Sequence, residues 1–316
     1  MIGYIFKRLL YGILVVLIMV TFVFVLMRSV PGDVVTLQLA EAGSVSEEQV
    51  DEMKSQLGLD KSIGIQLVVW LTNAVQGDLG NSLWSAQPVV NLIVERLPVT
   101  LELTFFSVIL AIIIGIPIGV LSAVKHNSFI DHILRVTAVG GLSIPNFWLG
   151  LIILLVLSLV FNWIPPLGFK SFSENPIVNF QQMVFPALVL AVTLSASIIR
   201  MTRSALLEVL HTDFIRTIRS KGAKERVVIY KHALRNSLVS VITLIGIQIG
   251  TLLGGTVVLE TIFSLPGLGS LIFESVTIRD YPIVQASVLT FGTMFLLVNL
   301  VVDVMYGWID PRIRNN

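Results

Sequence analysis

The residues with the most potential for chemistry lie in one basic segment, Arg216–Asn236. Seven of the 21 lysines and arginines fall there, and Glu225 is its only acid. A segment of this kind can bind nucleic acid, contact anionic lipid or dock on a partner protein. No nucleic-acid recognition motif accompanies the charge, and Tyr230 is the only aromatic residue in the segment. The nucleic-acid alternative is therefore the weakest of the three.

A glycine divides the segment, because the chain around Gly222 has the pattern of helix, break and helix. The second piece has an apolar side formed by Val227, Val228, Tyr230, Ala233 and Leu234. Arg226 and Lys231 lie opposite that side. An amphipathic helix can place such a side in a groove on another protein. Part of the positive charge is explained by the orientation of the chain in the membrane and by contact with anionic lipid. Docking on a cytoplasmic motor would in addition explain the glycine break and the apolar side.

No pattern elsewhere indicates catalysis or metal binding. The chain contains no cysteine, which excludes disulfides, zinc–thiolate sites and a cysteine nucleophile. It contains neither a G-x-x-x-x-G-K-[ST] phosphate loop nor an H-E-x-x-H zinc motif. None of the four histidines has a carboxylate at metal-ligand spacing; they are His126, His132, His211 and His232. We interpret them as surface or internally satisfied side chains, and we expect no catalytic residue, no metal and no cofactor in this chain.

The elements that carry the basic segment are membrane helices. Of the 316 residues, 55% are hydrophobic and 13% are charged, against about 25% charged in a typical soluble domain. The mean hydropathy is +0.89. Six uncharged runs reach the length of about 20 residues that crosses a bilayer. They are Leu9–Met27, Leu103–Val124, Val136–Phe169, Asn175–Ile199, Asn236–Leu259 and Tyr281–Val302. The sequence predicts an all-α membrane protein with six transmembrane helices.

The first and third runs need separate interpretation. The first run is longer than the apolar part of a signal peptide, and no small-residue cleavage site follows it, so we expect a retained helix. The third run is longer than one helix needs. Its end, WIPPLGF at Trp163–Phe169, has the proline pair and glycine of an exit turn.

The distribution of charge predicts the orientation. With the N-terminus in the cytoplasm, the cytoplasmic pieces are residues 1–8, 125–135, 200–235 and 303–316. They hold 15 of the 21 lysines and arginines. Cytoplasmic loops of membrane proteins are enriched in these residues. We therefore expect both termini and the basic segment in the cytoplasm.

The chain divides into four parts. Residues 1–28 form a cytoplasmic tail with the first helix, and residues 29–98 form an extracytoplasmic helical cap. Residues 99–303 form a five-helix core with a cytoplasmic loop at 200–235, and residues 304–316 form a cytoplasmic tail.

Local patterns predict helices within the cap. Ser46 and Gln49 form a capping box for a first helix that ends near Gly58. We expect a second helix at Gln66–Val75, a turn at GDLGNS (Gly77–Ser82), and a short third helix that starts at Pro88 and runs through Leu97.

Small residues and prolines mark the membrane helices. Gly246, Gly250 and Gly254 share one helix face, with Gln248 and Thr251 beside them. Such spacing lets helices approach closely, either within one subunit or at a subunit seam or substrate path. Gly115 and Gly119 flank Pro117, and Pro145 and Pro186 are further candidate bends. The apolar runs contain no charged residue, and the acidic residues Glu102 and Asp303 lie at the margins of the second and sixth runs. A transporter without an internal charge relay or a nucleotide site must be driven from outside its membrane domain.

The basic segment resembles the coupling loop of ABC importer permeases. Of the general pattern of that loop, the chain retains Gly222 and Leu234. The departures match one subfamily, the B-type permeases of dipeptide, oligopeptide, nickel and glutathione importers. The chain has DFIRTIRSKG at Asp213–Gly222 and HALRN at His232–Asn236.

Further motifs of that subfamily follow in order along nearly the whole chain. They are PGD (Pro31–Asp33), LGLD (Leu57–Asp60), GDLGNS, TLEL (Thr100–Leu103), IPNFWLG (Ile144–Gly150), MTRS (Met201–Ser204), ETIFSLPGLG (Glu260–Gly269), RDYPIVQ (Arg279–Gln285), NLVVD (Asn299–Asp303) and DPRIR (Asp310–Arg314). Val34 replaces the proline that usually follows PGD.

The resemblance implies a type I ABC importer in a bacterial or archaeal cytoplasmic membrane. A second, homologous permease would complete a heterodimer, and two cytoplasmic ATPase subunits would bind ATP and Mg²⁺. An extracytoplasmic binding protein would deliver the solute, and transport would proceed by alternating access. The implied coupling residues are Asp213, Arg216, Thr217, Arg219, Lys221, Gly222, Ala223, Lys224, Val227, Tyr230, His232, Leu234 and Arg235.

The resemblance also implies an outer contact and a class of solute. Residues 260–280 contain SLPGLGS, a re-entrant or interfacial turn that would face the binding protein through Pro266, Gly267, Gly269, Arg279 and Asp280. Most of the subfamily serves peptides, so we expect import of di- or oligopeptides. Nickel, a nickel chelate or glutathione are alternatives within the fold. An ion-coupled secondary transporter or a membrane scaffold is the alternative from another class, and neither would co-purify with ATPases.

Overall fold

The computed structural model describes residues 2–29, 51, 54–55 and 58–309. Within these residues the chain is helical, with one isolated antiparallel bridge between Asn81 and Pro88. The helices are α1 (Ile2–Ser29), α4 (Ile63–Val75), α5 (Val89–Val124), α6 (Phe129–Ser143), α7 (Asn146–Phe161), α8 (Pro176–Leu210), α9 (Asp213–Ser220), α10 (Glu225–Val227), the π-helix η1 (Val228–Ala233), α11 (Leu234–Gly255), α12 (Val257–Ile262), α13 (Leu268–Thr277) and α14 (Tyr281–Ile309). The capping box at Ser46–Gln49 and the motifs PGD and DPRIR lie outside the described residues.

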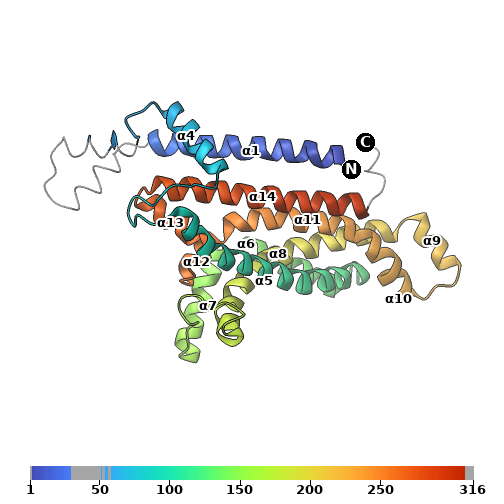
Figure 1. Cartoon of the computed structure of the whole chain (residues 1–316). Helices are drawn as coiled ribbons and strands as arrows, with labels where there is room; N and C mark the ends of the chain where they lie inside the picture. The colour runs from blue at the N-terminus through green and yellow to red at the C-terminus, as the bar shows by residue number, and fades with distance from the viewer. Residues whose placement is uncertain (1, 30–50, 52–53, 56–57, 310–316) are drawn as a thin grey trace.

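Five long helices, α1, α5, α8, α11 and α14, run side by side (Figure 1). Helix α8 lies at the centre and contacts α5, α6, α7 and α11, while α14 packs against α1 and α11. The core between α5 and α8 includes Leu103, Met183 and Leu190, which are fully buried or nearly so.

Glycines on α5 explain its close approach to α8. A Cβ atom on Gly119 would lie 2.6 Å from the Cβ atom of Thr202 and 2.9 Å from the carbonyl oxygen of Ile199. Gly115 faces Ile198 in the same way. These two glycines let the two helix backbones pack at a distance that any larger residue would prevent. The helix continues through Pro117, which the sequence marked as a bend.

The third apolar run is divided into α6 and α7, which meet at an angle of 96°, at the candidate bend that the sequence predicted at Pro145. Pro145 produces the bend. Ile144 before it is extended, with φ −86° and ψ 122°, and proline disfavours helical conformation in the residue that precedes it. Among the described residues, five helices are long and apolar enough to cross a membrane, or six if α6 and α7 form one bent span. The predicted exit turn is confirmed, since α7 ends at Asn162 in the left-handed conformation.

The cap differs from its prediction in one respect. The short helix expected from Pro88 to Leu97 is the first part of α5, so the expected boundary at residues 98 and 99 falls inside a continuous helix. The predicted helix at Gln66–Val75 is confirmed as α4. It is held to α1 by Arg28, whose Nε donates to Oε1 of Gln66 at 2.6 Å.

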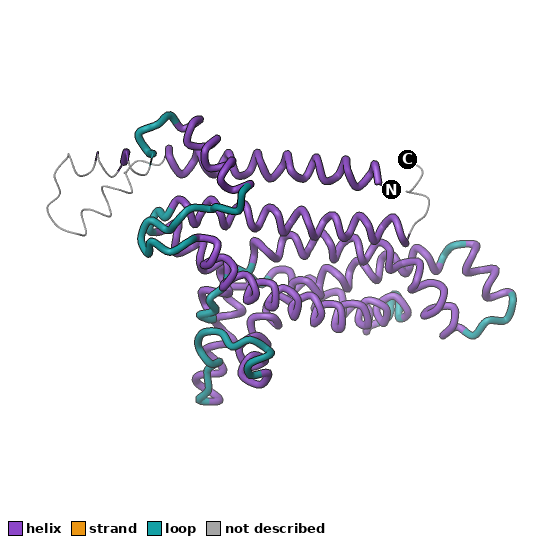
Figure 2. The backbone as a smooth tube through the Cα atoms, in the orientation of Figure 1, coloured by secondary structure: helices purple, strands orange, loops and turns teal. Residues whose placement is uncertain are grey.

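The two ends of the bundle carry different elements (Figure 1). The start of α1, the end of α14 and the segment α9–η1 lie at one end, which we name the basic end. Helices α4, α12 and α13 lie at the other, which we name the cap end. Figure 2 shows that loops at the basic end are short turns between helices.

Candidate coupling site

The basic segment forms a helical hairpin that projects from the basic end of the bundle (Figure 1). Helix α8 leads into α9, the chain turns at residues 221–224, and α10 and η1 lead directly into α11. The segment is therefore connected without a flexible linker to two long helices. Any force on it is transmitted to α8 and α11.

Gly222 allows the turn. Its φ is +81°, a left-handed conformation that costs other residues about 1–2 kcal/mol. Its amide donates to the carbonyl oxygen of Arg219 at 2.9 Å and closes α9. A Cβ atom at this position would meet nothing within 4 Å. Within the chain, glycine is required by the backbone conformation and not by close packing.

An ion pair bridges the turn. The guanidinium of Arg219 donates from Nη2 to Oε1 of Glu225 at 2.6 Å and from Nε to Oε2 at 3.2 Å. These hydrogen bonds raise the pKa of Arg219 above its ordinary value. Both side chains are about half exposed, at 43% and 57%, so the pair adds well under 1 kcal/mol. It fixes the angle between α9 and α10 more than it stabilises the protein.

The inner side of the hairpin is anchored to the bundle. Ile215 of α9 is fully buried, together with Val228 and Ala233 of η1. They pack against Leu206 of α8 and Val120 of α5 in one apolar cluster. Burying a single isoleucine side chain contributes about 1.5–3 kcal/mol. This cluster makes the hairpin and the ends of α5 and α8 one packed unit.

The outer side of the hairpin is apolar at its centre and basic around it. Phe214, Val227 and Tyr230 are 52%, 40% and 57% exposed. The ring of Phe214 contacts His232 edge to face at 6.2 Å between centroids. The exposed basic residues are Arg216, Arg219, Lys221, Lys224, Arg226, Lys231 and Arg235. Such a surface suits a protein groove with an acidic rim.

The structure places the predicted coupling residues on this outer side, with few exceptions. Asp213 and Thr217 are exposed, and Ala223, His232 and Leu234 are half-buried. The predicted apolar side of the second piece is wrong in part, because Val228 and Ala233 face the bundle. The cause is η1, a π-helix with i→i+5 hydrogen bonds, in which the 3.6-residue period does not apply.

The predicted glycine face of α11 packs mainly on α14. Added Cβ atoms would collide with Val302 at Gly246 and with Phe295 at Gly250. Gly254 has nothing within 4 Å and lines a hollow between α1, α11 and α14. Thr251 donates to the carbonyl oxygen and to Oε1 of Gln248, at 2.9 and 3.2 Å. Close packing within one subunit thus accounts for two of the three glycines.

At the cap end, the predicted binding-protein contacts are mostly internal. Gly267, Gly269 and Asp280 are buried, and only Pro266 and Arg279 are partly exposed. Asp280 accepts from the hydroxyl of Ser82 at 2.6 Å and from the amide of Leu83 at 3.3 Å. The prediction that Asp280 faces a partner is therefore wrong, because it binds the loop before α5.

Glu260 organises the turn between α12 and α13. It is fully buried and accepts from the hydroxyl of Thr100 at 2.8 Å and from the amide of Ser270 at 2.9 Å. Burial raises its pKa, and these hydrogen bonds oppose the rise. A Cβ atom on Gly269 would lie 2.6 Å from the Cα atom of Val257. The glycines that looked like contact residues are instead required by the carboxylate and the tight turn.

Sequence reasoning missed a polar cluster at the basic end. Asp131 of α6 is fully buried and accepts from Nε and Nη2 of Arg203, both at 2.8 Å. Ser128 caps α6 and accepts from the amide of Asp131 at 3.3 Å, and this S-x-x-D spacing is a signal visible in the sequence. Nothing local indicates the partner on α8. Within the described residues no three acidic or histidine side chains lie close enough to hold a metal ion.

Two family models together match most of the chain. Residues 115–315 match the binding-protein-dependent transport system inner membrane component, and residues 1–104 match the N-terminal membrane component of such systems.

Full-length relatives are similar throughout. The dipeptide transport system permease protein DppB of Alkalihalophilus pseudofirmus is 38% identical over 99% of this chain and 100% of its own length. The glutathione transport system permease protein GsiC of Escherichia coli is 41% identical over 99% of each chain. A putative peptide transport system permease protein of Brucella abortus is 40% identical over 98% of each.

Solved structures share the fold. The inward-facing MetNI methionine ABC transporter matches with a TM-score of 0.57 and 22% identity, over 69% of this chain and 96% of that chain. An amino acid ABC transporter matches with a TM-score of 0.55 and 16% identity. At these identities the likeness concerns the fold alone.

Proposed function

The chain belongs to the family of binding-protein-dependent transport system inner membrane components, and from that premise we propose that it forms half of a pathway for di- or oligopeptides. It is the permease subunit of an ABC importer. The partners we propose are a second, homologous permease, two ATPase subunits that hold ATP and Mg²⁺, and a binding protein outside the membrane.

The observation that carries this proposal is the two-sided hairpin at α9–η1. Its outer side offers exposed Phe214, Val227 and Tyr230 to an ATPase groove. Its inner side is anchored to α5 and α8 through Ile215 and Val228. Closure of the ATPases on ATP would push the hairpin, and the packed cluster would carry that movement into α8 and α11. The permease itself performs no covalent step.

The solute proposal is supported by the relatives. Those described above are named for transport of dipeptide, glutathione and peptide. Glutathione is a γ-linked tripeptide, so these names describe one chemical class. We propose the same class for this chain, with both termini and the basic end in the cytoplasm.

Purification with identification of partners tests the transport proposal. Affinity-tagged chain, extracted in mild detergent, should bring down two Walker-motif ATPases and a second permease. The complex is then reconstituted in proteoliposomes, with ATP enclosed on the side of the ATPases and the binding protein on the other side. Labelled dipeptide or tripeptide should accumulate only when ATP is present on the side of the ATPases. Uptake by the purified chain alone on an ion gradient would refute the proposal. ATP-dependent uptake of another solute with no peptide uptake would refute the peptide class alone.

A further inference from the structure

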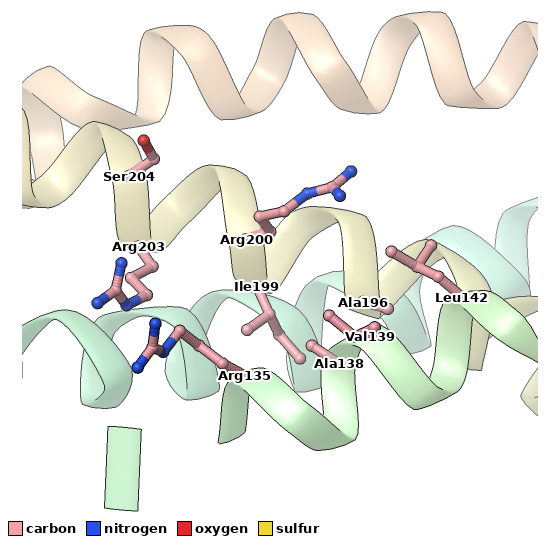
Figure 3. A pocket seen from close by; sticks show the side chains of 9 residues that line it. All are labelled: Arg135, Ala138, Val139, Leu142, Ala196, Ile199, Arg200, Arg203 and Ser204. Atoms are coloured by element: carbon pink, nitrogen blue, oxygen red, sulfur yellow. The ribbon is translucent and has the colours of Figure 1, made fainter. Parts of the chain in front are cut away.

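A pocket of about 210 Å³ lies between α6 and α8 toward the basic end (Figure 3). Alanine, valine, leucine and isoleucine side chains from both helices line most of it. Three arginines lie at its edges, and the side chain of Arg200 points away from those of Arg135 and Arg203 (Figure 3). Arg135 comes from α6, and Arg200 and Arg203 come from successive turns of α8. The coupling hairpin does not use this pocket.

One of the three arginines is neutralised within the protein. Arg203 donates twice to the buried carboxylate of Asp131 at 2.8 Å. The hydroxyl of Ser122, at 2.6 Å, and the amide of Asn127, at 3.0 Å, also donate to Asp131. A carboxylate has about four acceptor positions, so Asp131 is saturated. This cluster joins the start of α6 to α8 and builds one wall of the pocket.

The other two arginines are not fully neutralised, since Arg135 has only a longer ion pair with the carboxylate that Arg203 already engages. Arg135 lies 3.7 Å from Oδ1 of Asp131, beyond hydrogen-bond distance from an acceptor that is already saturated. Arg200 is exposed and forms no ion pair with any residue in the described part of the chain. His126 is the remaining titratable group at the cluster, with Nδ1 at 3.0 Å from Nη2 of Arg203. Three guanidinium groups and one carboxylate leave a net charge of about +2 beside an apolar surface.

The positions of Arg135 and Arg200 in the sequence indicate where the pocket lies relative to the hydrocarbon layer. Arg135 directly precedes one apolar run, and Arg200 directly follows another. The fold brings both to one pocket, which therefore lies where the two helices leave the hydrocarbon layer. On α6 next to it, Val136 and Val139 are 71% and 58% exposed, as expected for side chains that face lipid.

We propose that this pocket binds the headgroup of an anionic phospholipid, with Arg135 and Arg200 supplying positive charge on either side of it. The acyl chains would lie along Val136 and Val139 of α6. Guanidinium groups bind phosphate in bidentate fashion, and basic pockets between membrane helices suit lipid headgroups. The volume is smaller than that of pockets that enclose drug-sized ligands, and it suits a lipid headgroup. The inference does not depend on the transported solute.

Native mass spectrometry of the full chain in detergent, titrated with phosphatidylglycerol or phosphatidylcholine, tests the proposal. The double variant Arg135→Gln/Arg200→Gln should bind phosphatidylglycerol about 25-fold more weakly, about fivefold for each basic side chain near an anionic lipid. Arg203 stays in place because it holds α6 to α8. The variant Arg135→Lys/Arg200→Lys keeps the charge but lacks the bidentate donors, and its affinity should fall between those of wild type and of the glutamine variant. Lys7→Gln is the control, since it removes an exposed positive charge from α1 at the same end of the bundle, outside both the pocket and the coupling hairpin, and should bind like wild type.

Four results would overturn the proposal. Unchanged binding in the arginine-to-glutamine variant would mean that these side chains do not contact the lipid. An equal loss of binding in the lysine control would mean that binding depends on the overall charge of this end of the bundle. Equal binding of phosphatidylcholine would mean that the pocket does not prefer an anionic headgroup. If the arginine-to-glutamine variant no longer co-purified with the second permease, and the wild-type complex carried no lipid, the pocket would be a contact between subunits.

Discussion

Replacement of Gly222 isolates the contribution of the coupling turn. The left-handed φ of +81° disfavours alanine by about 1–2 kcal/mol, while a Cβ atom there touches nothing within 4 Å. If the hairpin must hold this turn to dock, Gly222→Ala should reduce the docked population about 5- to 30-fold. Asparagine adopts this conformation more readily, so Gly222→Asn should retain more activity than Gly222→Ala.

The assay is ATP-driven uptake in proteoliposomes, with ATP hydrolysis measured in parallel. Gly222→Ala should lower the amount of solute moved per ATP and leave membrane insertion intact. Gly168→Ala is the matched control, since Gly168 has φ +80° and nothing within 4 Å of its Cβ position, far from the hairpin. It should cost similar stability and leave coupling unchanged.

Two outcomes separate the causes. Normal coupling in Gly222→Ala would refute the conformational argument. A loss as large in Gly222→Asn as in Gly222→Ala would show that a partner approaches the turn closely and that sterics, not φ, require glycine.

Three further predictions concern the bundle. Ser82→Ala removes a donor from buried Asp280 and should destabilise the protein by about 1–3 kcal/mol in detergent, seen as a lower melting temperature. Gly119→Val should separate α5 from α8 and cost at least about 1–3 kcal/mol in the same measurement, whereas Gly140→Ala, with open space around it, should not. Because burial raises the pKa of Glu260, its contribution to stability is fully present below the unfolded pKa of about 4.3 and is lost as pH rises through the folded pKa. Melting temperatures of Glu260→Gln should lack that part of the decrease as the pH rises above about 4, and an unchanged pH profile would contradict this account.

Local patterns predicted the parts of the site that depend on neighbouring residues. The glycine break at residue 222, the exposed basic side and the helix on each side of the break follow from composition over about twenty residues. The π-helix was not predictable in this way. Its i→i+5 hydrogen bonds are stabilised by the burial of Val228, Ile229 and Ala233 against α5 and α8. The 3.6-residue period therefore assigned two of these residues to the wrong side.

The partly wrong prediction at residues 260–280 has a similar cause. The turn residues were recognised as a unit, yet no local pattern indicates that the turn is closed around Glu260 or that Asp280 binds Ser82. Pro266 and Arg279 remain the partly exposed members of that group. Their contact with a binding protein stays a prediction.

The sequence by itself determined the membrane class, the apolar runs, the position of the bend at Pro145 and the coupling segment, because hydropathy, charge and turn chemistry are written in consecutive residues. The tertiary structure alone decided which motifs meet. Thr100 and Glu260 are 160 residues apart, and Ser82 and Asp280 are 198 apart. The same holds for Arg135 and Arg200, each the flank of a separate apolar run and both at one pocket. Such pairings depend on how α5, α6, α8 and α12 pack, and no local period encodes the distance between side chains on different helices.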